Sequence, residues 1–175
     1  NSGKSAAVKC GLDSIAALRP KVVVLLDGDG QHDPAQIDVV SAPVLQGKAD
    51  LVIGSRFQDI QNDIPRWRQV GQHSLTWLTN LTSGVKTTDS QSGYRAFSAE
   101  VIPLLNFQTD GFSIESEMQF IAQQHNLRVV DVPISVLYVE PAKRNPFAHA
   151  LNVINGVLQL VGINRPLLFW GVPSL

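Results

Sequence analysis

Residues 22–34 read VVVLLDGDGQHDP, an aliphatic run that ends in alternating acidic residues and glycines. The continuous β-branched and aliphatic run at 22–26 predicts a central parallel strand that is buried on both faces. Asp27 and Asp29 follow at its carboxyl end, where α/β folds bind their ligands. Carboxylates on alternate residues can hold one hard divalent ion, and Gln31 can add an oxygen ligand on the same side. The stretch therefore predicts a metal site that leaves positions open for phosphate oxygens.

The stretch also resembles three other kinds of loop. A P-loop nucleoside triphosphatase also combines such a strand with a turn like Gly3-Lys4-Ser5, but it needs a glycine five residues before Gly3, which the sequence does not contain. An EF-hand loop needs glycine at its sixth position, which is His32 here, and Glu at its twelfth. A plain polar turn after the strand stays open as the alternative to a metal site.

Helical and strand patterns alternate along the 175 residues, which predicts an α/β domain with a mostly parallel sheet between helices. Cys10 is the single cysteine and is predicted to be a small buried core residue of the first helix. Pro43 is predicted to kink or shorten the second helix. The predicted helices cover residues 3–18, 33–46, 65–82, 113–124 and 146–162, and the predicted strands cover residues 22–26, 50–54, 93–97 and 128–139.

The C-terminal part differs from the rest in composition. Basic residues precede an amphipathic helix at 146–162, and residues 157–175 become steadily more apolar. This order is typical of a segment that lies on an anionic membrane surface, with ordinary core packing of the helix as the alternative. We therefore divide the chain into residues 1–145 and a segment at 146–175 that leads toward a membrane. The net charge of −1 argues against a nucleic-acid partner.

The order of several motifs carries a family resemblance. The motifs NSGKSAAVKCG, LDGDGQHDP, ADLVIGSRF, DSQSGYRAF, IESE and VPISVLY follow one another along the chain. In this order they resemble family 2 glycosyltransferases, and most nearly the dolichyl-phosphate mannose synthases and bacterial polyprenyl-phosphate glycosyltransferases. The resemblance implies the GT-A-like, Rossmann-like nucleotide-sugar fold. Two strands that hold the nucleobase precede these motifs in the family, so we expect those strands to be lacking and self-association to cover exposed sheet edges.

The resemblance implies a nucleotide-sugar donor, a Mg²⁺ or Mn²⁺ ion and transfer with inversion. Asp27, Asp29 and Gln31 would lie at the metal and the donor diphosphate, with Asp29 also counted as catalytic. Lys4 would lie near the sugar nucleotide at the start of the first helix. Arg56, together with either Arg66 or Arg68, would bind phosphate, because a guanidinium is always charged and can offer two donors to one phosphate.

The resemblance also assigns residues to the acceptor. Asp89 corresponds to the acid beside the acceptor; it would be a general base for a hydroxyl acceptor and would only orient a lipid phosphate, which is already an anion. Gly93 is expected to adopt an unusual backbone angle. Glu117 corresponds to the second acid of the family, and the alternative for it is a place on a solvated helix face. The remaining residues expected to bind substrate are Gln91, Ser92, Arg95, Glu117 and Arg144.

The expected function is the transfer of a hexose from a donor of the GDP-mannose or UDP-glucose class to a polyprenyl or dolichyl phosphate. We expect this reaction at the cytoplasmic face of the membrane. Transfer to a soluble or polysaccharide acceptor is the second hypothesis. A module that binds a metal or a partner without turnover is the third.

Overall fold

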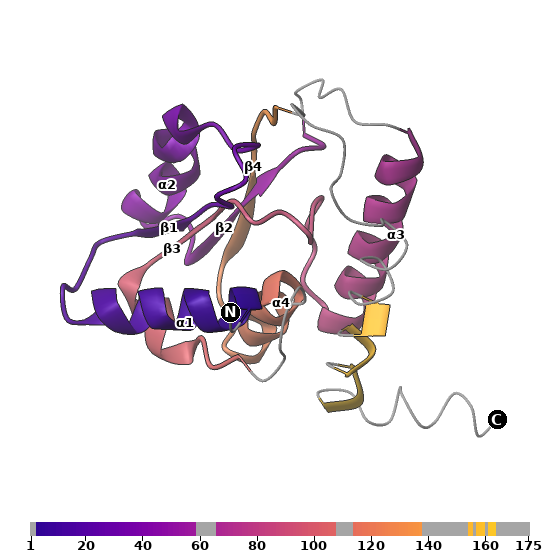
Figure 1. The fold of residues 1–175 in the computed structure, drawn as a ribbon. Helices are drawn as coiled ribbons and strands as arrows, with labels where there is room; N and C mark the ends of the chain where they lie inside the picture. The colour runs from indigo at the N-terminus through magenta and orange to yellow at the C-terminus, as the bar shows by residue number, and fades with distance from the viewer. Residues whose placement is uncertain are drawn as a thin grey trace.

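The computed structural model describes residues 3–58, 66–107, 114–137, 154–155, 157–159 and 161–163. The main helices are α1, α2, α3 and α4, and two short 3-10 helices, η1 and η2, accompany them (Figure 1). The helices and strands in chain order are α1 (Gly3–Ala16), β1 (Val23–Leu25), η1 (Pro34–Gln36), α2 (Ile37–Leu45), β2 (Leu51–Ser55), α3 (Arg66–Ser83), β3 (Arg95–Phe97), η2 (Ala99–Leu104), α4 (Ile114–Gln124) and β4 (Val129–Pro133).

The four described strands form one sheet in the order β1-β3-β2-β4. β2 and β4 pair in parallel, whereas β3 runs antiparallel to both β1 and β2. The α/β class is confirmed. The predicted mostly parallel sheet is corrected to a mixed sheet. In it β1, β2 and β4 share one direction, and β3, which lies between β1 and β2, runs the opposite way. Reversal places the start of β3, and not its end, at the carboxyl edge of β1 and β2, because Arg95 pairs with Leu25 and Ile53.

Helices cover both faces of this sheet (Figure 1). Side chains alternate across a strand, so neighbouring residues of β3 enter different cores. Phe97 packs with residues of α1 and α4, such as Leu12 and Met118. Ala96 packs on the opposite face with Val40 of α2. The sheet is thus packed between α1 and α4 on one face and α2 on the other, and the polar side chains lie in the loops at its carboxyl edge.

Two predictions about helices are corrected by the structure. Cys10 is exposed, because the inner face of α1 is made by Val8, Leu12 and Ile15, whose spacing leaves Cys10 on the outer side. Pro43 does not cause an early stop of α2, which continues to Leu45, and the alternative of a kink stays a prediction. Most of the other predicted helices and strands are found in the described residues with small shifts at their ends, but the strand predicted over residues 128–139 already ends at Pro133.

The described part of the predicted last helix is helical at residues 154–155, 157–159 and 161–163. Val157 and Val161 are buried against Phe120 of α4, so this part packs on the domain. The boundary predicted at residue 145 and the apolar tail at 164–175 lie outside the described residues. Among the helices that the structure describes, none is both long enough and apolar enough to span a bilayer.

Candidate functional site

Polar segments from separate parts of the chain meet at the carboxyl edge of β1 and β2. Asp27 follows β1, Arg56 follows β2, and the loop at residues 84–94 leads into β3 at the same edge. The start of α1 lies beside α4 in Figure 1, and this brings Lys4 to Glu115. A hollow of about 60 Å³ lies among these segments, with Lys4, Asp27 and Gly93 in its lining. Ligands of open α/β sheets bind at this kind of edge.

Lys4 joins two acids at this edge. Its Nζ lies 2.5 Å from Oδ1 of Asp27 and 2.5 Å from Oε1 of Glu115. Burial by itself would lower the pKa of Lys4, but the negative charges of Glu115 and Asp27 outweigh burial and raise it. Lys4 is therefore a fixed positive charge, and the side chain of Asp27 is held against it.

Gly93 makes room for the Asp27 carboxylate. A Cβ at position 93 would lie only 2.3 Å from Oδ2 of Asp27 and 2.7 Å from its Cγ. The backbone of Gly93 does not have a positive φ, whereas Gly30 in the turn after β1 has a φ of 79°. The expected unusual backbone angle at Gly93 is therefore wrong, and the requirement for glycine there is one of space.

His32 accepts a hydrogen bond from the backbone of the same turn. The backbone N–H of Asp27 donates to Nδ1 of His32 at 3.2 Å, and the imidazole ring lies 5.0 Å from the ring of Tyr94. Burial lowers the pKa of His32, so its imidazole is neutral at pH 7 and Nδ1 can accept this hydrogen bond. His32 thus fixes the backbone position from which the Asp27 side chain starts.

The predicted metal ligands supply oxygen atoms of suitable chemistry. Asp29 is exposed, and its Oδ1 accepts a hydrogen bond from the backbone N–H of Gln31 at 3.0 Å. In the part of the chain that the structure describes, no group of three His, Cys, Asp or Glu residues surrounds a potential ion position. Two carboxylates and an amide nevertheless fit a hard divalent cation that keeps sites for water or phosphate. The donor set therefore fits Mg²⁺ or Mn²⁺, with Lys4 already placed at Asp27.

Arg56 and Asp89 form a second charged pair at this edge. Nε of Arg56 donates to Oδ2 of Asp89 at 2.6 Å, and Nη2 donates to Oδ1 at 2.8 Å. The backbone N–H of Arg56 also donates to Oδ2 at 3.2 Å. The Asp89 side chain is fully buried and that of Arg56 is 11% exposed. Since both carboxylate oxygens face Arg56, this geometry suits orientation of the guanidinium better than proton abstraction from an acceptor.

Arg95 lies beneath the site and ties its loop to α4. Its guanidinium donates to the backbone carbonyls of Ser92, Glu115 and Ser90, at 2.9, 2.7 and 2.8 Å. Only 1% of this residue is exposed, and burial lowers its pKa against the opposing effect of nearby acids. Arg95 also lines the hollow beside Asp27, and its expected contact with substrate stays a prediction. Arg95 holds the loop from inside.

The other residues expected near the acceptor belong to a buried polar layer between the loop at residues 84–94 and α4. Nε2 of Gln91 donates to Oγ of Ser116 at 3.1 Å, and Oγ of Ser92 accepts from the backbone N–H of Tyr94 at 3.3 Å. Glu117 is 3% exposed, so a solvated helix face is excluded for it. These side chains build the floor of the site.

Two arginines that are predicted to bind phosphate or substrate, Arg68 and Arg144, have side chains outside the described residues. Arg68 lies in the first turn of α3, and its side chain, like that of Arg66, is outside the described residues. Arg144 lies wholly outside them. Both assignments stay predictions.

Two further acids of the site, Asp131 and Glu115, were not predicted from the sequence. Asp131 lies in β4 and accepts hydrogen bonds from Thr87 and Thr88 of the loop at residues 84–94. The available signal was a lone acid inside the apolar strand VVDVP. Glu115 lies in the IESE motif, but nothing in the sequence relates it to its partner Lys4, because the two residues are far apart in the chain.

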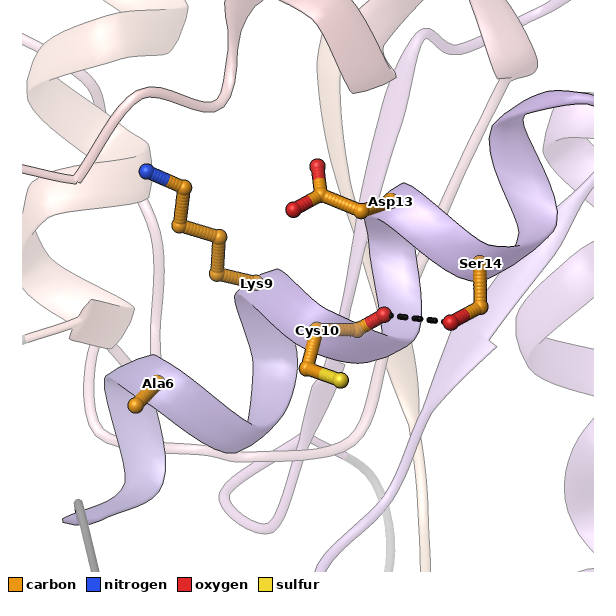
Figure 2. A pocket seen from close by; sticks show the side chains of 5 residues that line it. All are labelled: Ala6, Lys9, Cys10, Asp13 and Ser14. Atoms are coloured by element: carbon orange, nitrogen blue, oxygen red, sulfur yellow. Dashed lines mark hydrogen bonds between the residues drawn. The ribbon is translucent and has the colours of Figure 1, made fainter.

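A larger hollow on the outer side of α1 has a different character. Figure 2 shows that its lining comes from one helix only. The side chains do not converge, and the hydroxyl of Ser14 donates to the backbone carbonyl of Cys10 within the helix. The lining residues are Ala6, Lys9, Cys10, Asp13 and Ser14. We assign no site to this surface.

Comparison with known proteins gives this arrangement its class. Residues 1–103 match the family model described as Glycosyl transferase family 2, and the chain belongs to this family. The matched region contains Asp27, Arg56 and Asp89, the residues that meet at the sheet edge.

Two curated relatives are glycosyltransferases by name. The UDP-N-acetylglucosamine–dolichyl-phosphate N-acetylglucosaminyltransferase of Methanococcus voltae is 35% identical over 144 residues, which cover 80% of this chain and 57% of that protein. The undecaprenyl-phosphate mannosyltransferase of Micrococcus luteus is 30% identical over 125 residues, which cover 65% of this chain and 48% of that protein. The chain thus spans about half the length of these relatives.

A solved structure shares the fold. Glucosyl-3-phosphoglycerate synthase of Mycobacterium tuberculosis, in complex with Mn²⁺, uridine diphosphate and phosphoglyceric acid, superposes with a TM-score of 0.66 at 20% identity. The match covers 93% of this chain and 55% of that one. This likeness confirms the nucleotide-sugar glycosyltransferase fold.

Proposed function

We propose that the protein transfers a sugar from a nucleotide-sugar donor to a polyprenyl phosphate. The observation that carries the proposal is the meeting of the Asp27–Asp29–Gln31 turn with the Arg56–Asp89 pair at one sheet edge. A turn rich in oxygen ligands beside a fixed guanidinium suits a diphosphate and a second phosphate. Two relatives whose names specify dolichyl phosphate and undecaprenyl phosphate support the acceptor class.

Asp27, Asp29 and Gln31 would hold a Mg²⁺ or Mn²⁺ ion, which neutralises the charge of the leaving nucleoside diphosphate when bound. The Mn²⁺ and uridine diphosphate in the structural neighbour support this expectation. Lys4 adds a permanent positive charge next to Asp27. The donor diphosphate would thus meet two positive charges, the ion and Lys4, which stabilise the negative charge that it gains as it leaves.

Arg56 and Asp89 would act on the acceptor side. Asp89 keeps the guanidinium of Arg56 in one orientation through two hydrogen bonds. A lipid phosphate is an anion near neutral pH, so it needs a positioned cation more than it needs a base. The pair therefore orients the attacking phosphate oxygen in this proposal, and Asp89 does not remove a proton.

The acceptor class implies contact with a membrane surface, and we propose this contact at the cytoplasmic face. Three apolar side chains on α3 support it, because Val70, Trp77 and Leu81 are 66%, 65% and 63% exposed. Exposed apolar side chains on a helix can enter the interface of a bilayer. Self-association through a sheet edge stays a prediction, as does the division of the chain at residue 145.

A transfer assay tests the proposed function. The chain is incubated with Mn²⁺ and radiolabelled UDP-N-acetylglucosamine, UDP-glucose or GDP-mannose, with either undecaprenyl phosphate in detergent or 3-phosphoglycerate as acceptor. We expect label in the organic phase with the lipid acceptor and one of the donors. Label only in 3-phosphoglycerate would replace the lipid with a soluble acceptor. Failure of transfer with every pair would contradict the proposal.

A further inference from the structure

The carboxylate of Asp131 binds the loop that carries Asp89. Thr87 Oγ1 donates to Oδ1 of Asp131 at 2.8 Å. The backbone N–H and Oγ1 of Thr88 both donate to Oδ2, at 2.6 and 2.7 Å. Asp131 lies in β4 and pairs with Ile53 of β2, so these three hydrogen bonds tie the loop at residues 84–94 to the sheet.

The same contacts continue to the charged pair of the site. Thr87 Oγ1, which donates to Asp131, accepts a hydrogen bond from the backbone N–H of Asp89 at 3.3 Å. Thr88 Oγ1 lies 2.7 Å from Oγ of Ser55, the residue directly before Arg56. Asp131 is therefore connected to both partners of the Arg56–Asp89 pair through Thr87 and Thr88.

We propose that Asp131 is a positioning residue for the reaction: it fixes Thr87 and Thr88, and through them the orientation of Asp89 and Arg56. This inference rests on the proposed function for its effect on catalysis, although the contacts themselves do not. A carboxylate suits the position because it only accepts hydrogen bonds, and all three neighbours are donors. An amide in its place could still accept from Thr88, but its N–H groups would face Thr87 Oγ1, which would then have to turn its own hydrogen away and would lose its bond to a charged carboxylate.

The sheet offers a matched control at its opposite end. Asp50 precedes β2, and its carboxylate accepts three hydrogen bonds from Arg128, at 2.8, 3.0 and 2.7 Å. Asp50 thus resembles Asp131 in its number of bonds and in joining β2 to β4. Within the part of the chain that the structure describes, its carboxylate has no hydrogen bond to the loop at residues 84–94, so Asp50→Asn disturbs the sheet without disturbing the loop.

The test compares Asp131→Asn, Asp131→Glu and Asp50→Asn by three measurements. Hydrogen exchange of a peptide spanning residues 85–94 reports the loop, titration with Mn²⁺ and UDP reports the donor site, and the transfer assay gives kcat and KM for undecaprenyl phosphate. For Asp131→Asn we expect roughly tenfold faster exchange in the loop and UDP affinity close to that of the wild type. We expect kcat to fall on the order of 10²-fold, as it does for small misplacements of binding groups.

Asp131→Glu should recover part of the loss, since it restores the carboxylate, and Asp50→Asn should change none of the three readouts. Unchanged loop exchange in Asp131→Asn, or equal effects of Asp131→Asn and Asp50→Asn, would overturn the inference. If Asp131→Asn does not fold, Thr88→Val removes one of the donors and must shift the same readouts in the same direction. If the wild type transfers no sugar, the proposed function fails, and loop exchange alone still decides whether Asp131 positions the loop.

Discussion

At the scale of single residues, the site depends on side chains that hold one another in place. Lys4 holds Asp27, Asp89 holds Arg56, and Arg95 holds the loop carbonyls from below. Hydrogen bonds between charged groups are shorter and stronger than those between neutral groups. The consequence is a set of charges that keep their positions before any ligand arrives, which is the arrangement that electrostatic catalysis requires.

Gly93 gives the sharpest prediction at this scale. In Gly93→Ala the new Cβ would lie 2.3 Å from Oδ2 of Asp27, so the carboxylate must move away from its present position. We expect the free energy of unfolding to fall by about 1–3 kcal/mol, as overpacking usually causes. We also expect Mn²⁺ affinity, measured by water-proton relaxation, to weaken roughly tenfold, because a displaced ligand lowers metal affinity by such factors.

Gly11→Ala is the matched control, since a Cβ at position 11 meets nothing within 4 Å on helix α1. It should leave Mn²⁺ affinity unchanged and stabilise the protein by up to about 1 kcal/mol, because alanine favours helices over glycine. Wild-type Mn²⁺ affinity in Gly93→Ala would show that Asp27 does not need the space beside Gly93.

At the scale of helices and strands, β3 is the element that assembles the site. Because it runs antiparallel to β1 and β2, its first residue and the loop before it lie at their carboxyl ends. A parallel β3 would place that loop at the opposite edge, away from Asp27 and Arg56. The opposite edge is held by a different contact, the hydrogen bonds between Asp50 and Arg128.

The Asp50 contact predicts a pH dependence of stability. Hydrogen bonds from Arg128 lower the pKa of Asp50 below its ordinary value. A carboxyl group whose pKa is lower in the folded state stabilises the protein above its unfolded pKa of about 3.9, and this contribution disappears as the pH falls through the folded pKa. We therefore expect Asp50→Asn to lower Tm slightly at pH 6 and to match the wild type in strong acid.

Thermal unfolding of both proteins between pH 2 and pH 7 measures this difference. The effect is small because Arg128 is largely exposed to solvent. Asp13→Asn, which removes an exposed acid on the outer side of α1, is the control for a change of net charge alone. A Tm difference between Asp50→Asn and the wild type that persists at pH 2 would contradict the assignment.

The sequence indicated most of these elements, and the exceptions have physical causes. The aliphatic run before Asp27 correctly placed a strand, because that signal is local. The direction of β3 was missed, since three residues of strand carry no information about the direction of their neighbours. The partners of Lys4 and Asp131 were missed because they are distant in sequence, and the burial of Arg95 was missed because arginine is rarely fully buried.

At the scale of the whole molecule, the chain combines a fixed polar edge with an apolar exterior on α3. The charged pairs lie at the carboxyl ends of the strands, and Val70, Trp77 and Leu81 are exposed on a helix that packs beside α4. This combination is the one that the proposed transfer from a nucleotide-sugar to a polyprenyl phosphate would need. The stretch shared with this chain makes up 57% and 48% of the two curated relatives.

The most direct test of the account is calorimetric titration of this chain with UDP or GDP in the presence and absence of Mn²⁺. Asp29→Ala is compared with Asp13→Ala, since both residues are exposed acids but only Asp29 lies in the turn after β1. The account predicts nucleotide binding that requires Mn²⁺, is lost in Asp29→Ala and is retained in Asp13→Ala. Binding that is equal in the two variants, or that does not depend on Mn²⁺, would contradict a metal-assisted donor site at this edge of the sheet.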